Sequence, residues 1–101
     1  MTGPYQVRIA PHAAQDLRRL FSFLARRHRP AALRARKAIQ DTLLLPRTTP
    51  FSCRKATDDN PLLREIVIPF GASGYVALFE IEDATQVTVI GFRHQRESDY
   101  R

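Results

Sequence analysis

The fold of this chain is decided by residues 64–101, which read REIVIPFGASGYVALFEIEDATQVTVIGFRHQRESDYR. Three apolar runs rich in β-branched residues are separated by two turn signals, at residues 71–74 and 83–84. Strands are expected over residues 64–69, 75–82 and 85–93. Strands joined by such short turns must be antiparallel, because a parallel return needs a long crossover. The stretch therefore predicts a three-stranded antiparallel meander.

Apolar residues occupy both faces of the last two predicted strands. Val76 and Leu78 alternate with Ala77, Phe79 and Ile81, and residues 87–92 show a similar arrangement. A single pair of helices can cover only one face of a sheet. The second face therefore either carries an exposed apolar patch, which would mark a protein interface, or is covered by the long loop and the C-terminal tail.

The N-terminal segment predicts a short strand. Residues 5–9 alternate apolar and polar side chains with a period of two, which places Tyr5, Val7 and Ile9 on the inward face. Pro11 follows, at a position where a helix can begin because the first turn does not need the missing N–H group.

Two amphipathic helices are expected next. The first covers residues 12–27, where leucine and phenylalanine recur at the i, i+3, i+4, i+7 spacing of one helical face. The second begins at Pro30, carries a narrower stripe of alanine, isoleucine and leucine, and is expected to end at Pro46. Because the corner between them is short, the two helices form an antiparallel hairpin with its arginines directed away from the core.

Residues 46–61 are rich in Pro, Thr, Ser, Asp and Asn, which predicts a surface connection, and residues 51–55 could form a brief edge strand. The 101 residues suffice for one hydrophobic core, so we expect a single domain over residues 1–101. The predicted class is α+β: an N-terminal strand, a helical hairpin and a three-stranded antiparallel meander that packs on the hairpin.

Positive charge is concentrated in the N-terminal half. The net charge is +6, but residues 1–47 hold ten Lys/Arg against two acids, whereas residues 48–101 hold six against eight. This imbalance favours either an acidic partner or nucleic acid by electrostatic steering, or simply a solvated helix face.

Several classes of protein and site do not fit the composition. No apolar run approaches the length of a membrane span and no signal peptide is evident, so we expect a cytoplasmic protein without membrane association. The single Cys53 cannot form an intramolecular disulfide. His12, His28 and His94 are dispersed and lack the spacing of metal ligands, so we expect neither a metal nor a cofactor.

The order of strand, two helices, loop and meander resembles the RelE/ParE superfamily of toxins from bacterial type II toxin-antitoxin systems. The ParE branch is the more similar one. The most specific stretches are REIVIPFGASGYVALFEIED at residues 64–83 and GFRHQRESDY at residues 91–100, and the resemblance covers nearly the whole chain. It implies a RelE/ParE-like fold and a small toxin that is neutralised by a tightly bound antitoxin in a hetero-oligomeric complex.

The two branches imply different activities. ParE-like toxins inhibit DNA gyrase and thereby replication, whereas RelE-like toxins cleave mRNA in the ribosomal A site. RelE-like sites rely mainly on Lys, Arg and a Tyr near the C-terminus. Here Lys55, Arg64, Arg93 and Tyr100 match such a nuclease site, and His94 could serve as an acid or base near neutral pH. The chain has only two lysines, which weakens a site that must stabilise a charged phosphorane.

The expected function is therefore that of a noncatalytic gyrase inhibitor with a ParD-type antitoxin, and no catalytic residue is expected. Alternatives are a ribosome-dependent mRNA endonuclease and a degenerate module that only binds the antitoxin. No recognition-helix motif predicts sequence-specific DNA binding by this chain alone.

We expect the C-terminal segment of the antitoxin to wrap across the hairpin and the sheet. The residues expected to contact antitoxin or target are Arg18, Arg19, Arg26, Arg27, Arg34, Lys37, Arg93, Arg96 and Tyr100. Because successive side chains of a strand point to opposite faces of the sheet, Arg93 and His94 are expected on opposite faces of the last strand.

Overall fold

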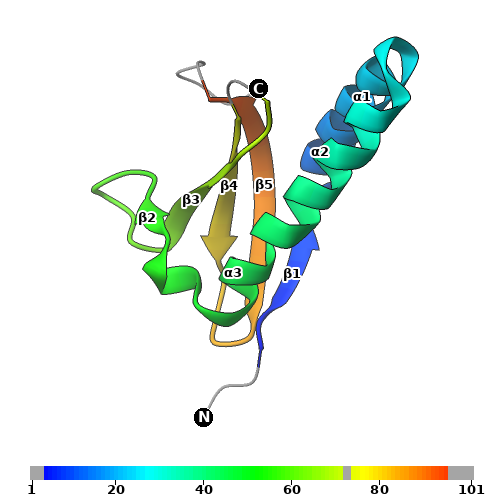
Figure 1. The fold of residues 1–101 in the computed structure, drawn as a ribbon. Helices are drawn as coiled ribbons and strands as arrows, with labels where there is room; N and C mark the ends of the chain where they lie inside the picture. Colours follow the sequence, from blue (N-terminus) through cyan, green and yellow to red (C-terminus); the bar gives the residue numbers. More distant parts are fainter. Residues whose placement is uncertain (1–3, 72–73, 96–101) are drawn as a thin grey trace.

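The computed structural model describes residues 4–71 and 74–95, and its secondary structure follows the predicted order (Figure 1). The elements are β1 (Gln6–Ile9), α1 (Pro11–Arg27), α2 (Arg29–Thr42), α3 (Leu44–Thr48), the 3₁₀ turn η1 (Pro50–Ser52), β2 (Arg54–Lys55), β3 (Leu63–Ile68), β4 (Tyr75–Ile81) and β5 (Gln86–His94). The α+β class is confirmed, and the bounds of the three meander strands lie within one residue of those predicted. Among the described residues, no helix is long and apolar enough to cross a membrane.

All five strands form one sheet in the order β1-β5-β4-β3-β2. The meander β3-β4-β5 is antiparallel, as predicted, and β2 adds a two-residue antiparallel edge. Strand β1 pairs in parallel with β5, with Val7 opposite Val87. The first strand of the chain is therefore the neighbour of the last, a pairing that local periodicity does not reveal.

The pairing of β4 with β5 contains a bulge. Leu78 lies opposite Gly91 whereas Phe79 lies opposite Val89, so Ile90 is an extra residue on β5. A bulge bends the strand and increases its local twist. It also brings Val89 and Phe92 onto the same face, where they pack with Phe79 in the core.

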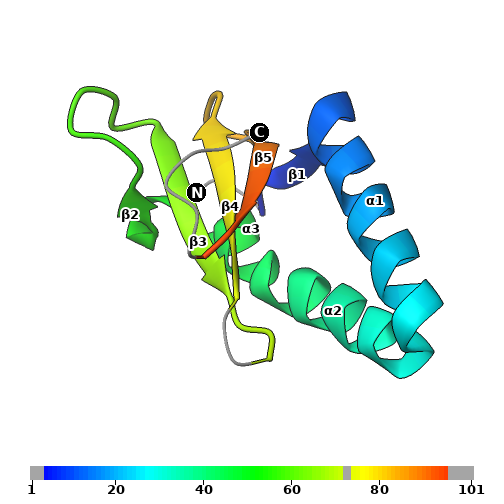
Figure 2. The same ribbon diagram turned by 90° about the horizontal axis from the view of Figure 1, so that it is seen from above.

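Helices α1 and α2 cover one face of the sheet, and no helix of the described residues lies on the opposite face (Figure 2). Helix α1 packs against β5, and α2 packs against α1 and β3. The buried core contains residues from both helices and from the strands β3, β4 and β5. Its members are Ala13, Leu17, Ile39, Cys53, Ile68, Ala77, Phe79, Ile81, Val87, Val89 and Phe92.

The expected end of the second helix is wrong, and one residue of the first strand is more exposed than expected. Helix α2 ends at Thr42, and Pro46 lies buried within the short helix α3. Proline is tolerated there because the first turn of a helix has no intrahelical acceptor for its N–H groups. Ile9 lies on the same side of β1 as Val7 and Leu43, as the alternation predicts, but it is 37% exposed because β1 is an edge strand.

The helix-free face does not carry the exposed apolar patch that was one of the two expectations for it. Val76 is fully buried there, and Val67, Leu78 and Ile90 are half-buried. Large exposed apolar side chains lie instead on the hairpin, on the α2–α3 corner, at the end of β1 and in the loops. They are Ile9, Phe23, Leu33, Leu44, Leu45, Phe51 and Leu62.

Gly74 closes the β3–β4 connection by a close backbone approach. Its carbonyl oxygen accepts a 2.8 Å hydrogen bond from the N–H of Gln95, and its own N–H donates to Oε1 of Gln95 at 3.0 Å. A Cβ atom at this position would overlap the backbone carbonyl oxygen of Ile68. Gly71, on the other side of the turn, adopts a φ of 64° in open space.

We expect Gly74→Ala to lower the free energy of unfolding by about 2 kcal/mol, because the added methyl group forces backbone atoms apart. Gly71→Ala is the matched control and should cost about 1 kcal/mol, since only its left-handed φ is unfavourable. Urea denaturation of the two variants measures both values. Equal stability of Gly74→Ala and the unsubstituted chain would contradict the close approach.

Candidate functional site

A cleft of about 300 Å³ lies where the hairpin meets the ends of β4 and β5. Its apolar lining comes from both layers of the fold: Leu17, Leu20, Ile39, Tyr75 and Phe92. Its polar lining consists of Asp16, Arg19, Arg93 and His94. The cleft therefore combines an apolar floor with charged side chains at its rim, which is the usual composition of a protein or peptide binding site.

Tyr75 on β4 and His94 on β5 are adjacent in the sheet. They are direct partners in the strand register, and their rings meet edge to face with centroids 5.6 Å apart. Burial raises the pKa of the Tyr75 phenol above its ordinary value of 10.0. The phenol is therefore protonated at neutral pH and offers a hydrogen-bond donor, not a base.

Arg93 lies on the opposite side of β5, as the period of two predicts. Its guanidinium Nη2 is 3.9 Å from Oε2 of Glu65, and Oε1 of the same carboxylate is 2.8 Å from Nε of Arg54. Glu65 and Arg93 have side chains only 13% exposed. One carboxylate on β3 thus pairs with arginines from β2 and β5, which neutralises part of their charge on the helix-free face.

The guanidinium of Arg64 donates hydrogen bonds to backbone carbonyl oxygens of the preceding segment. Its Nε donates to the carbonyl oxygen of Pro61 at 2.7 Å, and its Nη1 donates to those of Phe51 and Cys53 at 3.0 and 2.9 Å. The guanidinium also lies over the Phe51 ring, 5.3 Å from its centroid. These contacts tie the segment between α3 and β3 to the sheet.

The candidate nuclease residues do not converge on one surface. Arg64 lies opposite Phe79 on β4, whereas His94 lies opposite Tyr75, four residues away and about 13 Å along the strand. Arg93 points to the other face. Lys55 is exposed on the edge strand β2. Arg96 and Tyr100 lie outside the described residues.

The six basic residues predicted on the hairpin are all exposed in α1 and α2. Three of them have partners: Arg19 pairs with Asp16, Lys37 pairs with Asp41 at 2.9 Å, and Arg27 lies over the Phe23 ring. The other three form no ion pair with any described residue, and they are Arg18, Arg26 and Arg34. The hairpin therefore presents positive charge that the described fold leaves unneutralised.

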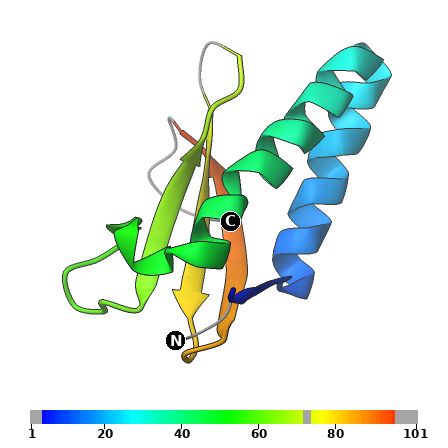
Figure 3. The same ribbon diagram turned by 60° about the horizontal axis from the view of Figure 1, so that its bottom comes forward.

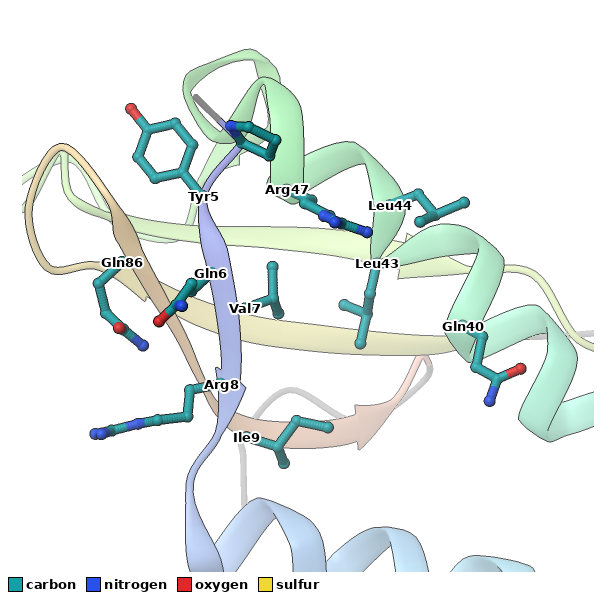
Figure 4. A pocket seen from close by; sticks show the side chains of 11 residues that line it. Tyr5, Gln6, Val7, Arg8, Ile9, Gln40, Leu43, Leu44, Arg47 and Gln86 are labelled. Carbon is teal, nitrogen blue, oxygen red and sulfur yellow. The ribbon is translucent and has the colours of Figure 1, made fainter. Parts of the chain in front are cut away.

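A second groove, of about 610 Å³, runs along the free edge of β1 (Figure 4). Figure 4 shows Val7, Ile9 and Leu43 on one side of the strand, and Arg8 and Gln86 on the other. Sequence reasoning predicted the strand and its alternation. It missed the groove, because nothing in the local pattern says that β1 lies at the sheet edge beside the α2–α3 corner.

No cluster of three or more His, Cys, Asp or Glu side chains suited to a metal ion occurs within residues 4–71 and 74–95. Burial raises the pKa of the Cys53 thiol, and the nearby Arg64 charge opposes this only in part. Within the described residues, the main candidate binding features are thus the basic hairpin and the two larger grooves.

A protein-family model described as "ParE toxin of type II toxin-antitoxin system, parDE" matches residues 7–99. The chain belongs to the ParE toxin family. The match begins in β1, covers every later helix and strand, and confirms the resemblance found in residues 64–83 and 91–100. No curated protein matched the chain. As a ParE-family toxin, the chain is one member of a toxin-antitoxin pair, so its surface must include a site for an antitoxin.

For this ParE-family toxin we expect Arg64 to contribute to stability. Arg64→Ala removes three hydrogen bonds to backbone carbonyl oxygens and should lower the free energy of unfolding by about 2 to 3 kcal/mol. Arg64→Lys keeps the charge but cannot reach all three acceptors, so it should recover less than half of that loss. Chemical denaturation measures both. An Arg64→Ala variant with unchanged stability that has lost toxicity would instead give this arginine a direct functional role.

Proposed function

We propose that this chain is a noncatalytic toxin that inhibits DNA gyrase in the cytoplasm and is held inactive by a ParD-type antitoxin in a hetero-oligomeric complex. The observation that carries the proposal is the family match over residues 7–99, whose description names the parDE system. Gyrase inhibition and the ParD type of the antitoxin go beyond that description and are the part that experiment must test.

The arrangement of the arginines supports a binding role over RNA cleavage. Metal-free cleavage of RNA needs cations around the phosphate and groups that move protons to and from the reacting oxygens. The donors of Arg64 are used by three backbone carbonyls, and Arg93 is paired with Glu65. Arg64 does not line the cleft that Arg93 and His94 share, and the guanidinium of Arg93 is directed to Glu65.

The hairpin supplies the surface that a binding toxin requires. It projects beyond the sheet, and its tip lies away from both edge strands (Figure 3). Phe23 and Leu33 are exposed on it, 46% and 62% respectively, and the guanidinium of Arg27 lies over the Phe23 ring. A mixed apolar and cationic surface of this kind suits an acidic protein surface, or the DNA that gyrase holds.

The antitoxin is proposed to use the same cationic surface together with the cleft at the end of β4 and β5. That cleft offers Leu17, Leu20 and Phe92 to an apolar side chain, with Arg19 at its rim. A segment that carries both acidic and apolar residues would satisfy both features. Occupying the hairpin in this way would also block its access to the target, which is a direct route to neutralisation.

The purified chain is expected to abolish supercoiling of relaxed plasmid by gyrase and to accumulate cleaved DNA, and the antitoxin encoded in the adjoining reading frame should restore supercoiling. Unaffected gyrase together with mRNA cut in the ribosomal A site would replace the proposal with a ribosome-dependent nuclease. No growth inhibition on expression without antitoxin would indicate a module that only binds the antitoxin.

Replacing Arg18 and Arg26 together by Gln is expected to weaken antitoxin binding about tenfold at low salt, because two unpaired positive charges are lost. The difference should shrink at 1 M salt, where exposed charges are screened. Lys55→Gln, at the far edge of the sheet, is the control and should change affinity little. Calorimetric titration at both salt concentrations measures these effects, and an equal loss in the double variant at both would exclude an electrostatic contribution.

A further inference from the structure

Strand β1 is an open edge of the sheet. It lies at one end of the strand order, and it extends over four residues, whereas the opposite edge strand β2 has only two. An exposed edge presents a row of backbone N–H and C=O groups to which another strand can pair. Of the two edges, only β1 is long enough to hold an added strand over several residues.

The hydrogen bonds of β1 show which backbone groups remain available. The N–H groups of Gln6 and Ala10 donate to the carbonyl oxygens of Thr85 and Val89, each at 2.8 Å. In a parallel pair alternate residues face the partner strand, so Val7 and Ile9 direct their N–H and C=O groups away from β5. Neither residue donates a backbone hydrogen bond to any other described segment outside the sheet.

The side chains along this edge differ between the two faces of the sheet. Val7, Ile9 and the corner residues Leu43 and Leu44 form an apolar strip on the helix side (Figure 4). Leu44 is 55% exposed and Ile9 is 37% exposed. A strand paired with β1 would cover this apolar strip with every second one of its own side chains.

Charge on the edge favours an acidic occupant. Arg8 lies on the side opposite the apolar strip and Arg47 lies near the start of β1, and neither forms an ion pair with a described residue. No Asp or Glu among residues 4–71 and 74–95 lines the groove. In addition, Nε2 of Gln86 is buried in the groove wall without a hydrogen-bond acceptor among the described residues. A carboxylate on this side would pair with Arg8.

We propose that β1 accepts an extended acidic segment of the antitoxin as an additional strand of the sheet. Alternate side chains of that segment are apolar and cover Ile9 and Leu44, and the intervening ones are acidic and face Arg8. A second copy of this chain suits the edge less well, because pairing two β1 strands would bring their Arg8 residues together without any acid in the groove. The inference rests on the antitoxin partnership proposed above, but not on gyrase as the target.

Amide hydrogen exchange tests the pairing directly. The purified chain is compared alone and in complex with the antitoxin encoded in the adjoining reading frame, and exchange is followed by NMR at Val7 and Ile9. Both amides should exchange rapidly in the free chain and slow at least tenfold in the complex, because they become hydrogen-bonded. Unchanged exchange in a formed complex would overturn the inference and leave the toxin function standing.

Two substitutions at Ile9 distinguish the contribution of its backbone N–H to antitoxin affinity from the contribution of its side chain. Ile9→Ala removes the apolar side chain but keeps the outward N–H, whereas Ile9→Pro also removes the N–H without breaking a bond to β5. Ile9→Pro should bind the antitoxin about fivefold more weakly than Ile9→Ala, the value of one hydrogen bond. Equal affinities would contradict strand pairing. Thermal unfolding of each variant identifies any that fails to fold, and the exchange measurement on the unsubstituted chain does not depend on them.

Charge reversal tests the side chains of the edge. Arg8→Glu should weaken antitoxin binding about tenfold, and Lys55→Glu, a charge reversal on the opposite edge strand β2, should have a smaller effect. An equal effect of the two would remove the specific role of Arg8.

A concentration-dependent dimer of the free chain with protected Val7 and Ile9 amides would replace the antitoxin by a second copy. Protected amides in the complex with unaffected gyrase would keep this inference and reject the proposed target.

Discussion

The parallel pairing of β1 with β5 is the constraint on which the rest of the structure depends. Helix α1 begins at Pro11, two residues after β1 ends, so the position of β1 determines where the hairpin starts. The hydrogen bonds of Gln6 and Ala10 hold both ends of β1 against β5. Because β5 also pairs with β4, β1 lies in the same sheet as the meander. The helical hairpin that follows β1 therefore covers the face of the sheet on which it starts.

The cations of this protein fall into two groups with different physical roles. Three arginines of the sheet are satisfied internally, since Arg64 binds loop carbonyls and Arg54 and Arg93 share the carboxylate of Glu65. Arg8 and Lys55, on the two edge strands, form no ion pair with a described residue. Partly buried charges need such partners, because removal from water is costly. Those on the hairpin are exposed, where an unpaired charge costs little and remains available for a partner. The same residue type therefore supports the fold where it binds internal acceptors and offers a binding surface where it is exposed and unpaired.

The two grooves and the hairpin suggest how a chain of this size accommodates more than one contact. The cleft at the end of β4 and β5 joins the two layers, whereas the groove along β1 lies at the sheet edge and the α2–α3 corner. A long partner segment can engage both without overlap. Binding through separate small sites increases affinity by effective concentration, without requiring a large flat interface.

Periodicity along the chain was sufficient to predict the α+β class, the hairpin, the three meander strands and the opposite orientations of Arg93 and His94, because each of these depends on residues that are close in sequence. The family resemblance in residues 64–83 and 91–100 was likewise visible from the residues alone. Long-range packing decided the rest: the place of β1 at the edge, the exposure of Ile9, the burial of Pro46 within α3, and the partners of Arg64 and Arg93. These depend on which segments meet in space, and a backbone carbonyl or a carboxylate more than ten residues away leaves no mark on the local pattern around the arginine that binds it.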